Sequence, residues 1–349
     1  MKLTRIGQGL IAAAACLGIG LGITSCNPGD TIDYLFVTSN SGTGAKSGIV
    51  TSYHVNSYSG TLLFVVDYYQ AGFSDTNPGP GELIVYPIGS NGSLGTPVAS
   101  GANAYTALQC FPTGVAVAPN GNYVYVTNTN SVVVTTSPPS TTTPPATPSA
   151  CPAQGTISGY AVGSGGALTA IAGSPFLAGS TPTGIAIDPT SRFLYATDSV
   201  QNQIIAYDIQ AAGVLDPLIN GPFTTGTFPV NITVDPRGEY IYVTNYNSST
   251  ISEYTLTQST GTPSLGAAAS FNTQSPFPTC ILVDPALGQY VFTSDFTSAN
   301  ITGAQLNPNT GGLTGIQDSP FPSNGSPTCV AAVPHGNHAT QFVPTTSGN

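Results

Sequence analysis

The most informative pattern in this chain is an alternation of bulky aliphatic and small residues that recurs between paired prolines. The two prolines of a pair lie seven residues apart, and the pairs begin at Pro112, Pro182, Pro229, Pro278 and Pro327. In most copies the third and fifth residues after the first proline are aliphatic, whereas the second and fourth are mostly small. A period of two with one bulky face is typical of a β-strand, so each pair predicts one strand.

A second predicted strand, rich in aromatic residues, follows each of these strands after a short turn. In one copy the turn contains Asn120 and Gly121, and the strand from Tyr123 to Asn128 reads Tyr-Val-Tyr-Val-Thr-Asn. Equivalent strands start at Phe193, Tyr240 and Tyr290. A third strand is marked by a tyrosine with an aliphatic residue two positions later, at Tyr53, Tyr86, Tyr160, Tyr207 and Tyr254. A Gly-x-Leu type of turn and a Ser-Pro-Phe or Gly-Pro-Phe segment then lead to the next copy.

This repeat predicts an all-β fold, a single β-propeller of four-stranded blades. The unit recurs about every 47 residues, which is typical of a propeller blade. One blade cannot bury both of its faces alone, so the units must close into a ring. A β-sandwich would also contain many short strands, but it has no reason to keep a fixed period. The small residues at the second and fourth positions suit inner strands that crowd together near a central axis.

The pattern predicts six to seven blades, with one N-terminal blade shortened. Six aromatic or aliphatic second strands are expected, near Tyr34, Leu62, Tyr123, Phe193, Tyr240 and Tyr290. The predicted third strands at Tyr53 and Tyr86 are only 33 residues apart, with no inner-strand pattern between them, so this copy looks shortened. We expect the ring to be closed by an inner strand at 328–333 that joins N-terminal strands at 34–40 and 48–55.

Two of the second strands carry a family resemblance. The sequence Tyr-Val-Thr-Asn at 125–128 and 242–245 resembles the signature of YVTN-repeat propellers. The longer repeat, over residues 33–335, resembles the lactonase-like (6-phosphogluconolactonase-type) propeller family. That resemblance implies a fold that is typically seven-bladed, and it implies lactone hydrolysis more weakly, because the repeated residues are structural.

The N-terminus predicts export and lipidation. Lys2 and Arg5 precede an apolar run at 10–23, which is shorter than the roughly 20 residues of a membrane span and suits a signal peptide. The run ends in Ile-Thr-Ser-Cys at Cys26, which resembles the lipobox of bacterial lipoproteins; the alternative is an ordinary secretory signal with a chance cysteine. We therefore expect a lipoprotein signal peptide at 1–25, lipidation of Cys26, an anchor linker at 26–32 and the propeller at 33–349. Asn27 favours the outer membrane of a bacterial cell envelope, by resemblance to a known sorting rule.

The charge balance limits the kinds of molecule that this protein is expected to bind. The chain has 5 Lys and Arg against 15 Asp and Glu, and a net charge of −10. So few cations cannot form a basic patch, which argues against a nucleic-acid partner. Beyond the signal peptide the cations are Lys46, Arg192 and Arg237, and both arginines lie in predicted turns. A phosphorylated sugar lactone would need several cations, so a neutral lactone is the better candidate.

Four cysteines lie within the predicted propeller. Cys110 and Cys151 flank a Thr- and Pro-rich insertion at about 131–155, and we expect them to form a disulfide at its base. The insertion is predicted to be a flexible spacer, with an O-glycosylated loop as the alternative. Cys280 and Cys329 occupy equivalent positions in consecutive units, which are usually too far apart for a disulfide, so they are predicted to be two buried thiols.

No catalytic or metal-binding constellation is visible in the sequence. His54, His335 and His338 are isolated, and His335, near the expected ring closure, is the first candidate for mutation. Two sets of polar residues are predicted to cap turns rather than to line a site. They are Asp188, Asp235 and Asp284 before the second proline, and Asn128, Asp198, Asn245 and Asp295 at the ends of second strands. No cofactor and no metal ion are expected, and the catalytic residues stay unknown.

Three functions fit these observations. The favoured interpretation is a monomeric, lipid-anchored propeller that binds a carbohydrate or protein ligand on one rim, on loops held by a rigid scaffold. The alternative is a lactonase-like hydrolase of a neutral lactone, which depends on the family resemblance. The third, a purely structural envelope protein, shares the sequence features of the first.

Overall fold

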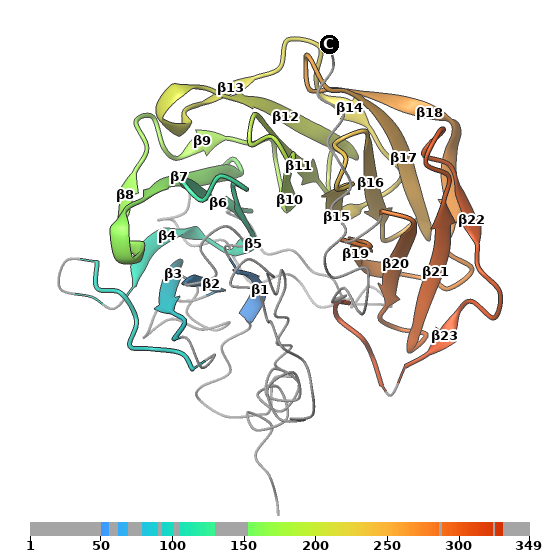
Figure 1. Ribbon diagram of the computed structural model, residues 1–349, viewed down its shortest axis with the longest axis horizontal. Helices are drawn as coiled ribbons and strands as arrows, with labels where there is room; N and C mark the ends of the chain where they lie inside the picture. The colour runs from blue at the N-terminus through green and yellow to red at the C-terminus, as the bar shows by residue number, and fades with distance from the viewer. Residues whose placement is uncertain are drawn as a thin grey trace, which may run out of the picture.

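The protein folds into antiparallel sheets that stand side by side around a common centre. The computed structural model describes residues 50–55, 62–68, 79–89, 93–100, 103, 105–129, 153–285, 288–323 and 325–330. These residues form five sheets, whose colours follow one another around the centre in Figure 1, with β5, β10, β15 and β19 innermost. This arrangement confirms the β-propeller prediction.

The blades have the following bounds. The first contains β1 (Val50–Val55), β2 (Leu62–Asp67), β3 (Pro80–Pro87) and β4 (Thr106–Cys110). The second contains β5 (Pro112–Val117), β6 (Tyr123–Asn128), β7 (Thr156–Val162), β8 (Leu168–Ala170) and β9 (Phe176–Leu177). The third contains β10 (Pro182–Ile187), β11 (Phe193–Asp198), β12 (Gln203–Ile209), β13 (Leu215–Pro217) and β14 (Phe223–Thr224). The fourth contains β15 (Pro229–Val234), β16 (Tyr240–Asn245), β17 (Thr250–Thr257) and β18 (Thr262–Asn272). The fifth contains β19 (Pro278–Val283), β20 (Tyr290–Asp295), β21 (Asn300–Leu306), β22 (Leu313–Gly315) and β23 (Phe321–Pro322).

The proline pairs mark the inner strands. In the second to fifth blades the inner strand begins at the predicted proline, and the aromatic segment that follows is the second strand. Two short 3₁₀ turns, η1 (Ser164–Gly166) and η2 (Ala211–Gly213), precede β8 and β13. No helix of the described residues has the length and apolar character that a membrane span requires.

The first blade corrects the predicted assignment of Tyr53. This residue lies in β1, the inner strand, which pairs with β2, and β2 pairs with β3. The blade therefore has all four strands, and the expectation of a shortened blade there was wrong. The paired prolines that mark the other inner strands are missing from β1, so a tyrosine followed by an aliphatic residue was misassigned to a third strand. Residues 325–330 contain no strand, although an inner strand was predicted at 328–333. Of its predicted partners, residues 50–55 form β1, which pairs with β2, whereas residues 34–40 lie outside the described residues.

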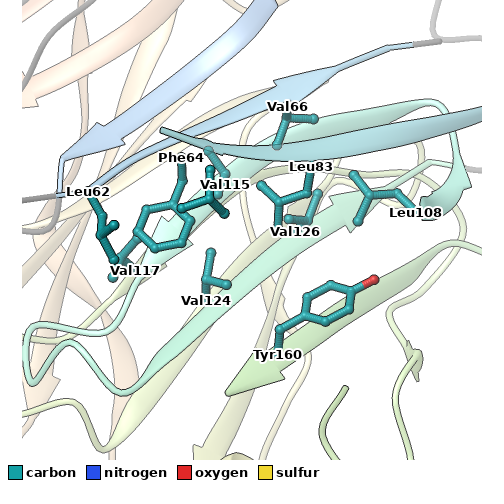
Figure 2. Packing of buried hydrophobic residues seen from close by; sticks show 11 residues of the cluster. Leu62, Phe64, Val66, Leu83, Leu108, Val115, Val117, Val124, Val126 and Tyr160 are labelled. Carbon is teal, nitrogen blue, oxygen red and sulfur yellow. The ribbon is translucent and has the colours of Figure 1, made fainter. Parts of the chain in front are cut away.

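The hydrophobic core lies between neighbouring blades. Figure 2 shows Leu62, Phe64 and Val66 of β2 packing against the aliphatic face of the second blade. That face includes Val115 and Val117, the third and fifth residues after the repeat proline. Burying one such side chain stabilises the fold by about 1.5–3 kcal/mol, so the repeated aliphatic positions are what hold blade to blade.

Around the centre, neighbouring inner strands approach closely. A Cβ atom added to Gly184 would lie 2.7 Å from the Cα of Asn231 in the next blade, which explains the small residue at this position. One residue earlier, the hydroxyl of Thr183 donates to the carbonyl of Pro229 at 3.0 Å. Thr113 makes the same kind of bond to the carbonyl of Thr183 at 3.1 Å. Small residues and threonines thus join the inner strands into one layer.

A second contact that links the blades comes from the middle of the second strands. The hydroxyls of Tyr125, Tyr195 and Tyr242 are buried, and each donates to a glycine carbonyl in the following blade. The acceptors are Gly213 at 2.7 Å, Gly261 at 2.8 Å and Gly311 at 2.7 Å. The aromatic residue of the repeat is therefore a hydrogen-bond donor as well as a core residue.

Cys280 and Cys329 form a disulfide, which corrects the prediction of two thiols. Their Cα atoms are 4.9 Å apart, and 49 residues separate them in sequence. Cys280 occupies the position of Gly184 in its own inner strand, where neighbouring blades nearly touch. The prediction used the usual spacing between blades, and this position is where that spacing is smallest.

Candidate functional site

The candidate site lies at the end of the blades where the inner strands begin and the second strands end. Because the strands are antiparallel, these two ends meet, as the pairs Pro112 with Asn128 and Pro278 with Asp295 show. We call this side the entry face. It is defined by the residues just before the inner-strand prolines and those at or just after the ends of the second strands.

Three phenylalanines on the entry face have an uncommon backbone conformation. Phe111, Phe228 and Phe277 each precede an inner-strand proline, and their φ angles are 52°, 57° and 61°. This left-handed region costs a bulky residue about 1–3 kcal/mol, and such strain is concentrated at functional sites. Aromatic side chains gather here, because the ring of Phe111 lies 5.2 Å from that of Tyr68, and the ring of Phe277 lies 4.9 Å from that of Tyr246.

Hydrogen bonds from neighbouring loops hold this conformation. The backbone N–H of Tyr246 donates to the carbonyl of Phe228 at 2.9 Å, and the N–H of Phe228 donates to the side chain of Asn202 at 2.7 Å. In the second blade the N–H of Thr129 donates to the carbonyl of Phe111 at 3.0 Å. The aromatic side chains of the entry face are therefore fixed on a rigid frame.

The polar residues that end the second strands lie just beneath this aromatic layer, and they are buried. Asp198 accepts backbone N–H bonds from Ser180 and Gln201, which confirms its predicted turn-capping role. The side-chain amide of Asn245 instead donates to the hydroxyl of Ser252 on the third strand. The side-chain oxygen of Asn245, Oδ1, has no partner among the described residues. Asp295 accepts from the hydroxyl of Thr302 at 2.6 Å, and burial raises the pKa of its carboxyl to about 6.

The turn-capping prediction is therefore wrong for three of the four residues at the second-strand ends. Asn128, like Asn245, donates to third-strand hydroxyls, at 3.1 Å to Ser158. Sequence spacing alone did not show that these side chains turn toward the third strand.

The first blade places an acidic pair in this layer, which the sequence analysis missed. Glu82 lies opposite Asp67 in the pairing of β3 with β2. In the four other blades the residue opposite the second-strand end is neutral: Thr156, Gln203, Thr250 or Asn300. In the sequence, Glu82 is visible as a single acid in the apolar segment Gly-Glu-Leu-Ile-Val. Only the strand register shows that it lies opposite Asp67.

Glu82 has the properties of a functional carboxyl group. It is 9% exposed, and its Oε2 atom has no hydrogen-bond partner among the described residues. Burial, assisted by the nearby charge of Asp67, raises the pKa of Glu82 to about 7. The preceding Gly81 lies against Pro112, since a Cβ there would collide with the proline ring. Successive residues of a strand point to opposite faces, so Glu82 lies on the other face of β3, with Ile84 and Tyr86, at the entry-face end of the first blade.

On the side opposite the entry face, the repeat position before the second proline holds aspartates that stabilise turns. Asp188 accepts from the N–H groups of Arg192 and Phe193, both at 2.7 Å. Asp235 accepts from the N–H of Tyr240 at 2.8 Å and from the Nε of Arg237 at 2.8 Å. The turn-capping prediction is confirmed for these two aspartates. Both arginines lie in the turns of this opposite side, so within the described ranges no Lys or Arg lies on the entry face.

Several predicted site residues cannot be placed. Cys26, Cys151, His335 and His338 lie outside the described residues, as does most of the 131–155 insertion, and the side chain of His54 is not described. Cys110, buried at the end of β4, is disulfide-bonded, and its pairing with Cys151 stays a prediction. In the described part of the chain no cluster of His, Cys, Asp and Glu could hold a metal ion.

Comparison with known proteins agrees with this architecture. Residues 154–283 match the model of the family described as "Lactonase, 7-bladed beta-propeller". The match spans less than half of the chain, and over this segment the sequence is similar to the lactonase-like β-propellers. No curated protein gives a significant match to it.

Two solved structures have the same fold as this chain. A candidate 6-phosphogluconolactonase from Bacteroides uniformis is 16% identical, with a TM-score of 0.56, and the match covers 86% of this chain and 97% of that one. Another from Bacteroides fragilis is also 16% identical, with a TM-score of 0.52 and coverage of 77% and 83%. The family match favours the hydrolase alternative over a pure binding module, and the family description favours seven blades.

Proposed function

We propose that this lactonase-like propeller hydrolyses a neutral lactone at its entry face, with Glu82 as the general base. The observation that carries the proposal is the state of Glu82: a buried carboxyl group with a free oxygen and a pKa of about 7, opposite Asp67 at the entry-face end of the first blade. A general base is most effective when its pKa is close to the working pH. The family match over residues 154–283 supplies the reaction class.

The proposed reaction needs one base that later acts as an acid. Glu82 takes a proton from a water molecule while that water attacks the lactone carbonyl carbon. The ring C–O bond then breaks, and the departing alkoxide takes the proton from Glu82. The products are one hydroxy acid and the regenerated carboxylate, so no cofactor or metal is required.

The charges on the entry face support a neutral substrate. Its described residues include Asp67, Glu82, Asp198 and Asp295 and no cation, so a phosphate group would be repelled. The negative charge of these acidic residues would also assist release of the product, because hydrolysis converts a neutral lactone into an anion. The rings of Tyr68 and Phe111 offer an apolar surface against which a sugar ring can lie.

The test is an assay of the full chain against neutral sugar and acyl lactones, measured as proton release. We expect Glu82→Gln to lower kcat by about 10²–10⁴-fold, the contribution of a positioned general base. Glu239→Gln is the matched control: it makes the same chemical change in a turn on the opposite side, and we expect wild-type activity. Full activity in Glu82→Gln would refute the role of Glu82. Lactone binding without turnover would restore the binding-module interpretation.

We also propose that the protein is anchored in the bacterial envelope through lipid on Cys26. The support is the lipobox-like sequence that ends at this residue and the net charge of −10, which gives little attraction to anionic lipid. Cys26→Ser should move the protein from the membrane fraction to the soluble fraction. Continued membrane association of this variant would refute the anchor.

A further inference from the structure

A second site is formed at some distance from the entry face, between the fourth and fifth blades. It is a cleft of about 160 Å³, lined by Tyr240, Glu253, Tyr254 and Gly266 of the fourth blade and by Thr310 and Gly311 of the fifth. Tyr240 starts β16, whereas the entry face lies at its other end, Asn245. The cleft is thus separate from the proposed lactonase site.

The cleft exists because the fourth blade departs from the repeat. Glu253 lies opposite Tyr242, and the same third-strand position is Gly159, Ala206 or Gly303 in the second, third and fifth blades. In those blades an aliphatic residue of the outer segment covers the small residue. A Cβ on Gly159 would lie 3.2 Å from Ile171, and one on Gly303 would lie 2.7 Å from Ile316.

In the fourth blade the described residue of the outer strand that lies next to Glu253 is a glycine. Gly266 lies against Glu253, since a Cβ there would be 3.3 Å from the carbonyl oxygen of Glu253. Glu253 and Gly266 both line the cleft, whereas an isoleucine packs against the corresponding small residue in the second and fifth blades. The fourth blade therefore has Glu253 where the second, third and fifth blades have a small residue, and it has Gly266 beside it where the second and fifth have an aliphatic residue. The carboxyl group of Glu253 faces the cleft.

Among the described residues, the carboxyl group of Glu253 has no salt-bridge partner. It is 4% exposed, and burial raises its pKa to about 7, against the opposing effect of a hydrogen bond from the backbone of Leu313. The titratable groups on its face of the sheet are Tyr240 and Tyr242 of β16, whereas the neighbouring Tyr254 of β17 points to the opposite face. Burial raises the pKa of all three tyrosines, so they are neutral at pH 7. No Lys or Arg is among the described residues that line the cleft.

We propose that this cleft binds a small primary ammonium group carried on an aliphatic chain. An ammonium ion would supply the charge that a buried carboxylate requires, and it would form a charge-assisted hydrogen bond. Its aliphatic part would lie against the ring of Tyr240. An anion would be repelled, and a single carboxylate is too few ligands for a calcium ion, which takes six to eight oxygens.

The test is calorimetric titration of the full chain with butylammonium, and with 1-butanol as the uncharged probe of the same shape. We expect butylammonium to bind and 1-butanol not to bind. Affinity should rise about tenfold between pH 6 and pH 8, because Glu253 ionises over that range while the amine stays protonated. Equal binding of the two probes, or no binding of butylammonium, would refute the proposal.

Variants separate this site from nonspecific attraction to an acidic protein. Glu253→Gln should abolish binding, whereas Glu239→Gln, an equal change of charge outside the cleft, should leave it unchanged. Gly266→Ile keeps the carboxyl group and restores the aliphatic residue of the other blades, so it should also abolish binding. Unchanged affinity in either Glu253→Gln or Gly266→Ile, with folding verified by circular dichroism, would overturn the assignment.

Discussion

The disulfide between Cys280 and Cys329 should make a large contribution to stability. It joins the inner strand of the fifth blade to the next inner segment of the chain, beside a hydrogen bond from Thr279 to the carbonyl of Thr328 at 3.1 Å. The perturbation is the double variant Cys280→Ala/Cys329→Ala. Alanine is small enough for a position where the inner strands nearly touch, so the packing there is retained.

The magnitude follows from the length of chain that the disulfide closes. For a sequence separation of 49 residues, the loss of conformational entropy in the unfolded chain corresponds to about 4 kcal/mol. The double variant should therefore unfold at a clearly lower urea concentration, with a somewhat higher m-value, because the unfolded chain without the cross-link exposes more surface. Tyrosine fluorescence can follow the transition, since the chain has 17 Tyr and no Trp.

Replacement of both cysteines is a sharper perturbation than a reducing agent, because a reductant would also break the disulfide of Cys110. A loss of less than about 1 kcal/mol would refute the reasoning. It would mean that the unfolded chain is already constrained in this region, or that the remaining contacts between the inner strands are sufficient.

Two further predictions concern stability. Tyr195→Phe removes the donor to the buried carbonyl of Gly261 and should cost about 1–3 kcal/mol in urea unfolding, whereas Tyr290→Phe, at an exposed side chain, should cost less than about 0.5 kcal/mol. The protein should also be more stable at pH 5 than at pH 8. Burial raises the pKa of Glu82 and Glu253 to about 7 and that of Asp295 to about 6, so the folded state binds these protons more tightly than the unfolded state. Stability is then lost as the pH rises from about 4.5 to 7, by on the order of 3 kcal/mol for each glutamate. The double variant Glu82→Gln/Glu253→Gln should flatten this dependence, and a wild-type protein that is more stable at pH 8 would contradict it.

Much of the fold could be predicted because each blade must satisfy the same packing requirements, so the same residue types recur at the same positions of the repeat. Pro112, Pro182, Pro229 and Pro278 all begin inner strands, since a proline at the first residue of a strand costs no hydrogen bond of the ladder. The small residue at Gly184 is explained by the contact of adjacent inner strands. The first blade was misassigned because β1 lacks the proline pair, so its period alone could not place it.

The candidate site was harder to predict, because it depends on departures from the repeat. Glu82 and Glu253 are the single acids of β3 and β17, and an acidic residue in a strand ordinarily faces solvent. Their burial follows from register: Glu82 faces Asp67, and Glu253 faces Tyr242. The disulfide between Cys280 and Cys329 could not be predicted for a similar reason. It depends on the short distance between two inner segments, and the spacing of the cysteines in the sequence does not give that distance.

The most direct test of the proposed function is the pH dependence of kcat/KM for the best neutral lactone substrate. The account predicts a rise with a midpoint near pH 7, where Glu82 ionises, and loss of that rise in Glu82→Gln while Glu239→Gln retains it. A profile in Glu82→Gln that matches the wild type in rate and midpoint would contradict the assignment of the base to this residue.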